Sequence, residues 1–336
     1  MLYIDSINSA LHELMDSDRN VVMIGEDLLD PYGGAFKASR GLSTKFPKQI
    51  ISTPISEQAI VGMAIGMSMR GMRPIVEIMF GDFITLCVDQ IVNHASKYNW
   101  MFNGQVNVPI VIRTPMGGGR GYGPTHSQSL ESLFMSVSGI RICAPSIYHN
   151  PGNLLKNSVL ENQHPLIFIE NKSEYSEKLY SGSTLDNNMQ LSVIQKEGVS
   201  ETILISAYPN EVADVVIVTY GGMARIAVEA ALEIFIKEEV IIHVVVPSMI
   251  RHIPIKDILP SVEKSGRVLI LEEGNKIGGW GAEVSSILHE NIFSSLYKPV
   301  VRLGAEDCPI PSAMPIESEV LPTIKKLKKL IMTLVA

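Results

Sequence analysis

Short, continuous runs of apolar residues recur along the first half of the chain, separated by helical patterns. The runs cover residues 21–24, 74–78, 108–112 and 165–169. Runs of this length that end at turn residues are typical of strands buried on both faces of a sheet. Residues 82–99, which lie between two of these strands, repeat apolar positions every three to four residues and are predicted to form the clearest helix.

The second half of the chain repeats this arrangement. Apolar runs cover residues 214–220, 240–246 and 268–272, and an alanine-rich helical pattern over 225–237 follows the first of them. Because the apolarity is continuous, we expect parallel strands covered by helices. Residues 181–212 lose this periodicity and carry turn residues, which predicts a linker. The pattern therefore favours an α/β protein of two doubly wound, mostly parallel sheets, with domains over residues 1–180 and 213–336.

One helical segment, residues 61–69, has almost no polar face. Gly62 and Gly66 are four residues apart, which lets a second helix approach closely. The same spacing occurs in membrane helix pairs, but this segment is too short to span a bilayer, and Arg70 and Arg73 close it. The segment therefore predicts a subunit interface.

The composition narrows the class of protein. Apolar residues make up 46% of the 336 positions, which is enough for two cores, and a net charge of −7 argues against a nucleic-acid partner. Cys87, Cys143 and Cys308 are odd in number and show no paired spacing, which favours a reducing compartment over disulfides or zinc. The sequence has no leader pattern and no apolar run near the roughly 20 residues of a membrane span. We therefore expect a protein of the cytoplasm or an organelle matrix, with no membrane partner.

The most informative motif lies at residues 51–62. Pro54 keeps the residue before it extended, Ser56 is a good N-cap, and Glu57 falls in the first helical turn. An acid at this position has an ordinary structural role, since it complements the helix dipole by roughly 0.3–1 kcal/mol. The motif alone therefore leaves a structural and a chemical role open.

The Thr-Pro-Ile-Ser-Glu run at residues 53–57 resembles the beta subunit of the thiamine-diphosphate-dependent decarboxylase component of 2-oxo acid dehydrogenase complexes. The resemblance covers nearly the whole chain, in the family's order and spacing, through residues 25–27, 33–37, 73–74, 80–83, 89–91, 126–129 and 278–283. It implies a transketolase-like pyrimidine-binding domain followed by a transketolase C-terminal domain.

The resemblance also implies roles for individual residues. Glu57 is expected to activate the aminopyrimidine of thiamine diphosphate, because a carboxyl group in a dry pocket can hold a proton there. Phe83 is expected to stack on the pyrimidine, with Phe80 as the competing candidate and plain core packing as the alternative for both. His126 is expected to reach the substrate or its carboxylate. Glu26 matches a second glutamate near the cofactor, although a solvated loop acid is an equally good interpretation.

His126 follows a glycine-rich segment, residues 116–125. A phosphate-binding loop is rejected, because no Lys-Ser or Lys-Thr pair follows the glycines. We predict a mobile loop that shapes the entrance of the site.

The sequence lacks the Gly-Asp-Gly motif that holds Mg²⁺ and the diphosphate in thiamine enzymes, since its one Gly-Asp pair, Gly81-Asp82, continues into Phe83. The resemblance therefore implies that an alpha subunit carries this motif, within an alpha2-beta2 heterotetramer, and that no metal site lies on this chain.

Three functions are compared. The favoured one is decarboxylation of a small 2-oxo acid and transfer of its acyl group to a lipoyl acyltransferase component. The second is a two-component thiamine enzyme that forms an acyloin or aldehyde without a lipoyl partner. The third is a non-catalytic scaffold, which the presence of both Glu57 and His126 disfavours, because a scaffold needs neither.

Overall fold

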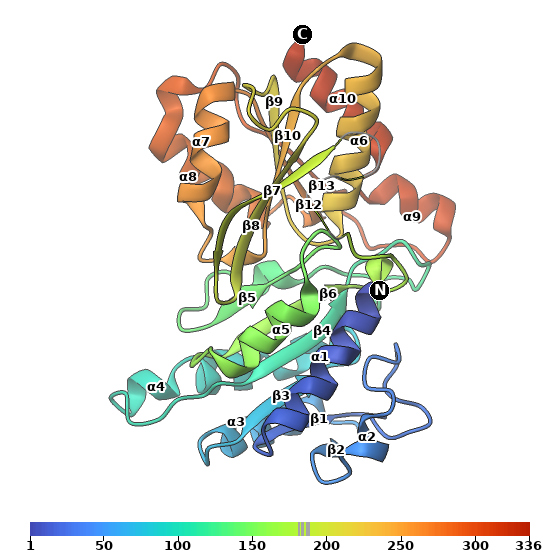
Figure 1. Cartoon of the computed structure of the whole chain (residues 1–336), viewed down its shortest axis with the longest axis vertical. Helices are drawn as coiled ribbons and strands as arrows, with labels where there is room; N and C mark the ends of the chain where they lie inside the picture. Colours follow the sequence, from blue (N-terminus) through green and yellow to red (C-terminus); the bar gives the residue numbers. More distant parts are fainter. Residues whose placement is uncertain (181, 183–184, 186–188) are drawn as a thin grey trace.

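Two sheets, one in each half of the chain, form the framework of the computed structural model (Figure 1), which describes residues 1–180, 182, 185 and 189–336. In spatial order, the first sheet contains β11 (Met249–Arg251), β5 (Arg141–Cys143), β6 (Leu166–Asn171), β4 (Val111–Met116), β3 (Arg73–Glu77), β1 (Val21–Gly25) and β2 (Ile50–Ser52). The second contains β13 (Val301–Ala305), β12 (Val268–Asn275), β9 (Val215–Thr219), β10 (Ile242–Pro247), β8 (Ser200–Ser206) and β7 (Gln190–Glu197).

Most neighbouring strands are parallel. The antiparallel pairs are β11 with β5, β10 with β8 and β7 with β8. The central strands are buried along their length, as their continuous apolar runs require. The predicted class of two doubly wound, mostly parallel α/β sheets is confirmed.

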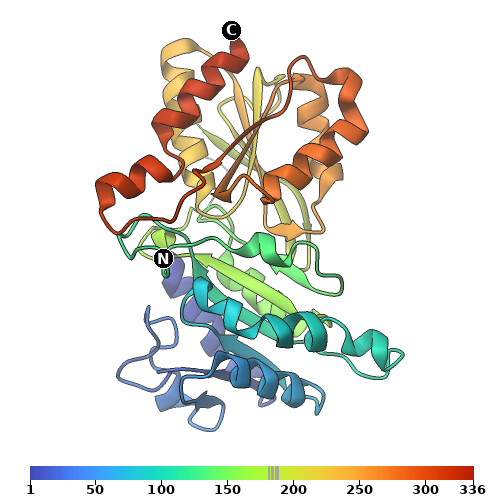
Figure 2. The same ribbon diagram turned by 180° about the vertical axis from the view of Figure 1, so that it is seen from behind.

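Helices cover both faces of each sheet (Figures 1 and 2). One continuous apolar core joins the sheets to α1 (Tyr3–Ser17), α5 (Pro151–Leu160), α6 (Met223–Glu238) and α10 (Ile324–Val335). A second core, on the opposite faces, includes α3 (Glu57–Ser68), α7 (Ile255–Ser265) and α8 (Trp280–Ile292). Shorter pieces are α2 (Leu42–Lys45), α4 (Tyr98–Met101), α9 (Met314–Val320), η3 (Glu131–Phe134), η4 (Lys172–Glu174) and η6 (Phe293–Ser295). Within the described part of the chain, no helix combines the length and apolarity needed to cross a membrane.

The helix predicted over residues 82–99 is wrong in its geometry. The structure has a 3₁₀-helix, η1 (Gly81–Cys87), then a π-helix, η2 (Gln90–Ala95), and then the short α4. These windings have fewer or more residues per turn than an α-helix, so side chains leave the predicted face. Val88 is 37% exposed, whereas Ile84 and Ile91 are buried.

The segment predicted as a linker, residues 181–212, contains two strands of the second sheet, β7 and β8. β7 is an exposed edge strand with a mixed sequence, so it lacks the continuous apolar run that marks the central strands. Residues 181, 183, 184 and 186–188 of this segment lie outside the described residues. The halves also interlock, because β11, from the second half of the sequence, pairs with β5 of the first sheet.

Candidate functional site

The predicted site residues lie on segments that follow the carboxyl ends of neighbouring parallel strands. Glu26 follows β1, Glu57 begins the helix after β2, Phe80 and Phe83 follow β3, and His126 ends the loop after β4. From β1 the chain continues to β2 on one side and then to β3 on the other. Such a reversal of strand order opens a crevice at the carboxyl edge of a sheet, where ligands bind in open α/β folds.

Two carboxyl groups lie out of water at this edge. Glu26 is 8% exposed and Glu57 is 7% exposed. Burial raises the pKa of Glu26, and the negative charge of Glu57 raises it further, so the two groups are close enough to interact. Oε1 of Glu26 has no hydrogen-bond partner among the described residues. A ring nitrogen or amine could supply the partner that this oxygen lacks.

His126 lies against two phenylalanine rings. Its ring centroid is 4.7 Å from that of Phe80 and 5.3 Å from that of Phe83, and both contacts are edge-to-face. The ring of Phe80 also contacts those of Phe36, at 5.3 Å, and Tyr122, at 6.1 Å. The structure thus brings both phenylalanine candidates to His126 in one aromatic cluster.

The carboxyl pair and the aromatic cluster are connected through η1. Phe83 and Cys87 both lie on η1, which packs against α3. Burial raises the pKa of the Cys87 thiol to about 12, and the charge of Glu57 contributes to this rise. Glu57 therefore lies close to the element that carries Phe83.

The glycine-rich loop is held by two carboxylates from the second half of the chain. The N–H of Gly118 donates to Oε1 of Glu273 at 2.8 Å. The N–H groups of Gly119 and Gly121 donate to the two carboxylate oxygens of Glu317, each at 2.9 Å. These hydrogen bonds give the loop glycines a structural role, and the mobility of the loop stays a prediction.

Lys172 lies beneath the aromatic cluster. Its side chain is fully buried, and Nζ is 5.6 Å from the centroid of the Phe80 ring. Among the described residues, Nζ has no hydrogen-bond partner. Burial lowers the pKa of Lys172 to about 8, although the carboxylates of Glu273 and Asp82 favour its charged form.

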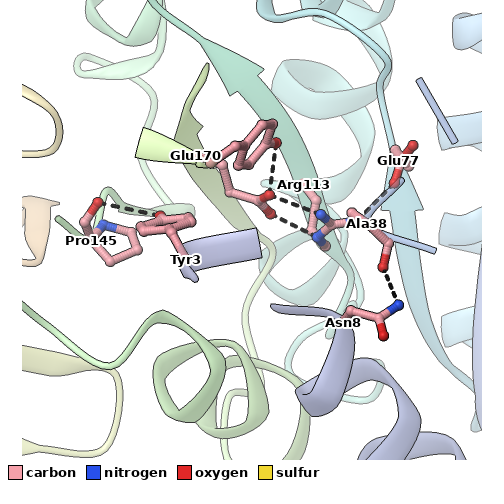
Figure 3. Close-up of polar contacts among 8 residues, drawn as sticks. Tyr3, Asn8, Ala38, Glu77, Arg113, Pro145 and Glu170 are labelled. Atoms are coloured by element: carbon pink, nitrogen blue, oxygen red, sulfur yellow. Dashed lines mark hydrogen bonds and ion pairs between the residues drawn. The ribbon is translucent and has the colours of Figure 1, made fainter. Parts of the chain in front are cut away.

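A buried ion-pair network joins the strands below the site (Figure 3). Arg113 on β4 donates Nε and Nη2 to the two oxygens of Glu170 at 2.7 and 2.9 Å, and Nη1 to Glu77 at 2.8 Å. The hydroxyl of Tyr175 donates to Glu170 at 2.9 Å. The network therefore fixes β3, β4 and β6 relative to one another.

Comparison with known proteins places the chain in a family. The family model for the pyrimidine binding domain of transketolase matches residues 1–178, and the model for the transketolase C-terminal domain matches residues 207–327. Pyruvate dehydrogenase E1 component subunit beta-1, mitochondrial, of Oryza sativa subsp. japonica is 34% identical over 327 residues, which cover 96% of this chain and 83% of that protein. The chain belongs to the family of 2-oxo acid dehydrogenase E1 beta subunits.

Other members of this E1 beta family are equally similar. The 2-oxoisovalerate dehydrogenase subunit beta of Bacillus subtilis (strain 168) is 35% identical over 331 residues, which cover 97% of this chain and 93% of that protein. Among solved structures, a split gene transketolase described as an inactive beta4 tetramer has a TM-score of 0.74 at 20% identity, and the match covers 100% of this chain and 98% of that one. This likeness confirms the predicted transketolase-like fold. E1 beta subunits work with alpha subunits in hetero-oligomers, and the family is related to thiamine diphosphate.

In this E1 beta family member, Phe36, Tyr122 and Lys172 contact the aromatic cluster and Glu317 holds the glycine-rich loop, and none of these residues was among the predicted candidates. Phe36 and Tyr122 lie beside glycines in loops, and an aromatic residue in such a loop could have been recognised as a candidate. No pattern in the neighbouring sequence marks Lys172 or Glu317 as a candidate site residue. Lys172 lies between Asn171 and a serine, a sequence that is typical of a solvated turn. Its burial depends on packing between segments that are distant in the chain.

Proposed function

We propose that this chain is the beta subunit of a thiamine-diphosphate-dependent 2-oxo acid dehydrogenase. It supplies Glu57 to an active site shared with an alpha subunit, and the acyl group of the substrate passes to a lipoyl acyltransferase component. The observation that carries the proposal is the buried Glu26–Glu57 pair beside the His126 aromatic cluster, at the carboxyl edge of the first sheet.

The residues at this edge fit the pyrimidine half of the cofactor. When bound, thiamine diphosphate supplies the nucleophilic carbon and the electron sink for decarboxylation. Glu57 holds the proton at the ring nitrogen N1′ of the aminopyrimidine, and the buried Glu26, whose Oε1 has no partner among the described residues, lies close enough to interact with Glu57. Phe83, or Phe80, offers an apolar face for the ring. His126 is half-buried, which leaves its imidazole able to meet the substrate.

The remaining half of the site is assigned to the alpha subunit. The sequence has no Gly-Asp-Gly motif, and among the described residues no three His, Cys, Asp or Glu side chains gather to hold a metal ion. We therefore assign Mg²⁺ and the diphosphate contacts to the alpha chain. The outer face of α3 supports a subunit contact, because Met63 is 52% exposed and a Cβ on Gly66 would meet nothing within 4 Å.

The assembly that follows is an alpha2-beta2 heterotetramer in the cytoplasm or an organelle matrix, acting on a small 2-oxo acid. The named relatives include mitochondrial and bacterial proteins, in agreement with either compartment. Reduction of a lipoyl domain by the assembled enzyme distinguishes this function from that of an acyloin-forming enzyme, which would release its product with the lipoyl domain unchanged.

The proposal is tested with Glu57→Gln in the reconstituted alpha–beta complex. The change is nearly isosteric but removes the carboxyl group, so exchange of the C2 proton of bound thiamine diphosphate for deuterium should slow by at least about 100-fold, and CO₂ release should fall with it. Glu263→Gln, at an exposed position of α7, is the matched control and should leave both rates unchanged. An unchanged exchange rate in Glu57→Gln would remove Glu57 from the mechanism.

A further inference from the structure

We infer that Glu317 is a positioning residue of the active site, which acts through the glycine-rich loop on Tyr122 and His126. This inference rests on the proposed function for its effect on turnover. Glu317 lies on α9, in the second half of the chain, and it is 198 residues from Gly119. The site of the first sheet would therefore be completed by a carboxylate of the other half of the molecule.

The carboxylate of Glu317 accepts hydrogen bonds from two N–H groups of the loop, two residues apart. Its Oε1 accepts the N–H of Gly119 and its Oε2 accepts the N–H of Gly121, each at 2.9 Å. The side chain is 1% exposed, so these bonds form away from water. Hydrogen bonds from N–H groups to a carboxylate are roughly twice as strong as those between neutral groups. Glu317 therefore fixes the direction of two peptide planes on either side of Arg120.

The loop also lies directly against the segment that carries Glu317. A Cβ on Gly118 would be 2.7 Å from Cδ1 of Leu321, and a Cβ on Gly121 would be 2.9 Å from the carbonyl oxygen of Ser312. At Gly121 an added Cβ would meet backbone at a φ of +69°, so glycine is required there, whereas at Gly118 the side chain of Leu321 would have to shift. Figures 1 and 2 both show α9 beside the loop that follows β4. The loop and the α9 segment therefore pack closely against each other, and the two hydrogen bonds to the Glu317 carboxylate form part of this contact.

His126 is five residues after Gly121, so the position of the loop affects the position of the site residues. Tyr122 directly follows Gly121, and its ring contacts that of Phe80 at 6.1 Å. The N–H of His126 donates to the carbonyl oxygen of Gly123 at 3.3 Å, and the His126 ring lies 4.7 Å from Phe80. A shift of Gly119 and Gly121 would therefore move the imidazole relative to the aromatic cluster. Misplacement by about 1 Å can reduce a rate by about 100-fold.

The experiment replaces Glu317 by Gln in the reconstituted complex. The amide keeps one acceptor oxygen but opposes the second N–H with its own NH₂ group, so one loop amide loses its partner. Hydrogen–deuterium exchange of the 116–126 peptide should accelerate by at least about tenfold. The turnover number should fall by at least about tenfold, while KM and thiamine diphosphate affinity stay within about threefold. Glu319→Gln, at an exposed position of the same helix, should change none of these values.

A second variant keeps the test informative if Glu317→Gln assembles poorly. Gly121→Ala displaces the loop by its contact with Ser312 and leaves the charge of Glu317 in place, so it should lower turnover in the same way. Faster exchange with unchanged turnover would show that the loop position is irrelevant to the site. Unchanged exchange would show that Glu317 does not hold the loop, and equal losses of turnover, cofactor affinity and stability would reduce its role to folding. Should the wild-type complex decarboxylate no 2-oxo acid, the proposed function fails, and peptide exchange still decides whether Glu317 holds the loop.

Discussion

Glu26, Glu57 and Lys172 are ionisable residues that are buried near the carboxyl edge of the first sheet. Burial raises the pKa of Glu26 and lowers that of Lys172, because it disfavours the charged form of these two groups. His126 differs from them because it is half-buried and packs through its ring against aromatic edges. The candidate site therefore combines buried ionisable groups with a more accessible imidazole.

Replacing His126 by Ala should impair a step after cofactor binding. Loss of an acid–base or charge-stabilising group should lower turnover by about 10²–10⁴-fold. Thiamine diphosphate affinity should stay within about tenfold, or 1.4 kcal/mol, because the carboxyl pair is untouched. Calorimetric titration beside a decarboxylation assay of the reconstituted complex separates these effects. His289→Ala is a matched control, since His289 is also half-buried beside a phenylalanine, Phe293. Collapse of affinity with normal turnover in the surviving complex would make His126 a structural residue.

Replacing Lys172 by Met should stabilise the isolated chain near pH 7. Burial lowers the pKa of Lys172 from 10.5 to about 8, a difference that corresponds to roughly 3 kcal/mol. Below pH 8 Lys172 is protonated in both the folded and the unfolded state, so the folded state is destabilised by the full cost of burying the charge. Between pH 8 and 10.5 Lys172 loses its proton in the folded state first, so this destabilisation decreases. The stability advantage of Lys172→Met over wild type should therefore shrink.

Urea unfolding at several pH values and a fixed protein concentration measures this advantage. Lys329→Met, at an exposed position of α10, serves as the control and should change stability by less than about 0.5 kcal/mol. A Lys172→Met chain that is less stable than wild type at pH 7 would show that the buried ammonium finds compensation in the fold.

At the scale of elements, the sequence predicted strands that carry a continuous apolar run, whereas β8 is buried along most of its length and was still assigned to the linker. β1 and β9 are buried along their whole length, so a local apolar run was enough to identify them. β7 was not predicted, because an exposed edge strand has no such run. Its place in the sheet depends on pairing with β8, which is a tertiary interaction. The 3₁₀ winding that begins at Gly81 and the π winding of η2 were also not predicted. A Cβ on Gly81 would be 2.3 Å from Cγ of Met116, a contact that no local pattern reports.

The Arg113 network makes a prediction at this scale, because it joins three neighbouring strands. Arg113→Met leaves the carboxylates of Glu170 and Glu77 buried without their cation, which should cost roughly 3–5 kcal/mol of unfolding free energy. Lys45→Met is the control: Lys45 also forms a 2.8 Å ion pair, with Asp16, but both side chains are at least half exposed, so its loss should cost less than about 1 kcal/mol. Urea unfolding of both isolated chains gives the comparison. Similar losses would mean that burial does not set the strength of these pairs.

At the scale of the whole molecule, hydrogen bonds and strand pairing join the two halves. Gly118 and Glu273 are 155 residues apart and share a hydrogen bond, and β11 extends the first sheet from the second half of the sequence. The resemblance of motifs to a known family supplied Glu26, Glu57, Phe83 and His126 as candidates. It could not supply Glu317 or Lys172, because their significance depends on which distant segments the fold places beside them.

The last prediction concerns the chain without its partner. The isolated chain should neither bind magnesium–thiamine diphosphate tightly nor decarboxylate a 2-oxo acid. The diphosphate carries most of the charge of the cofactor, and a chain with net charge −7 and no Gly-Asp-Gly motif offers neither metal ligands nor a basic cradle to offset it. The exposed face of α3 should still favour self-association. Isothermal titration of the lone chain, repeated after addition of an alpha subunit, measures the difference, with the alpha subunit titrated alone as the control. Binding by the lone chain at about 1 μM, near −8 kcal/mol, would refute a site shared between two polypeptides.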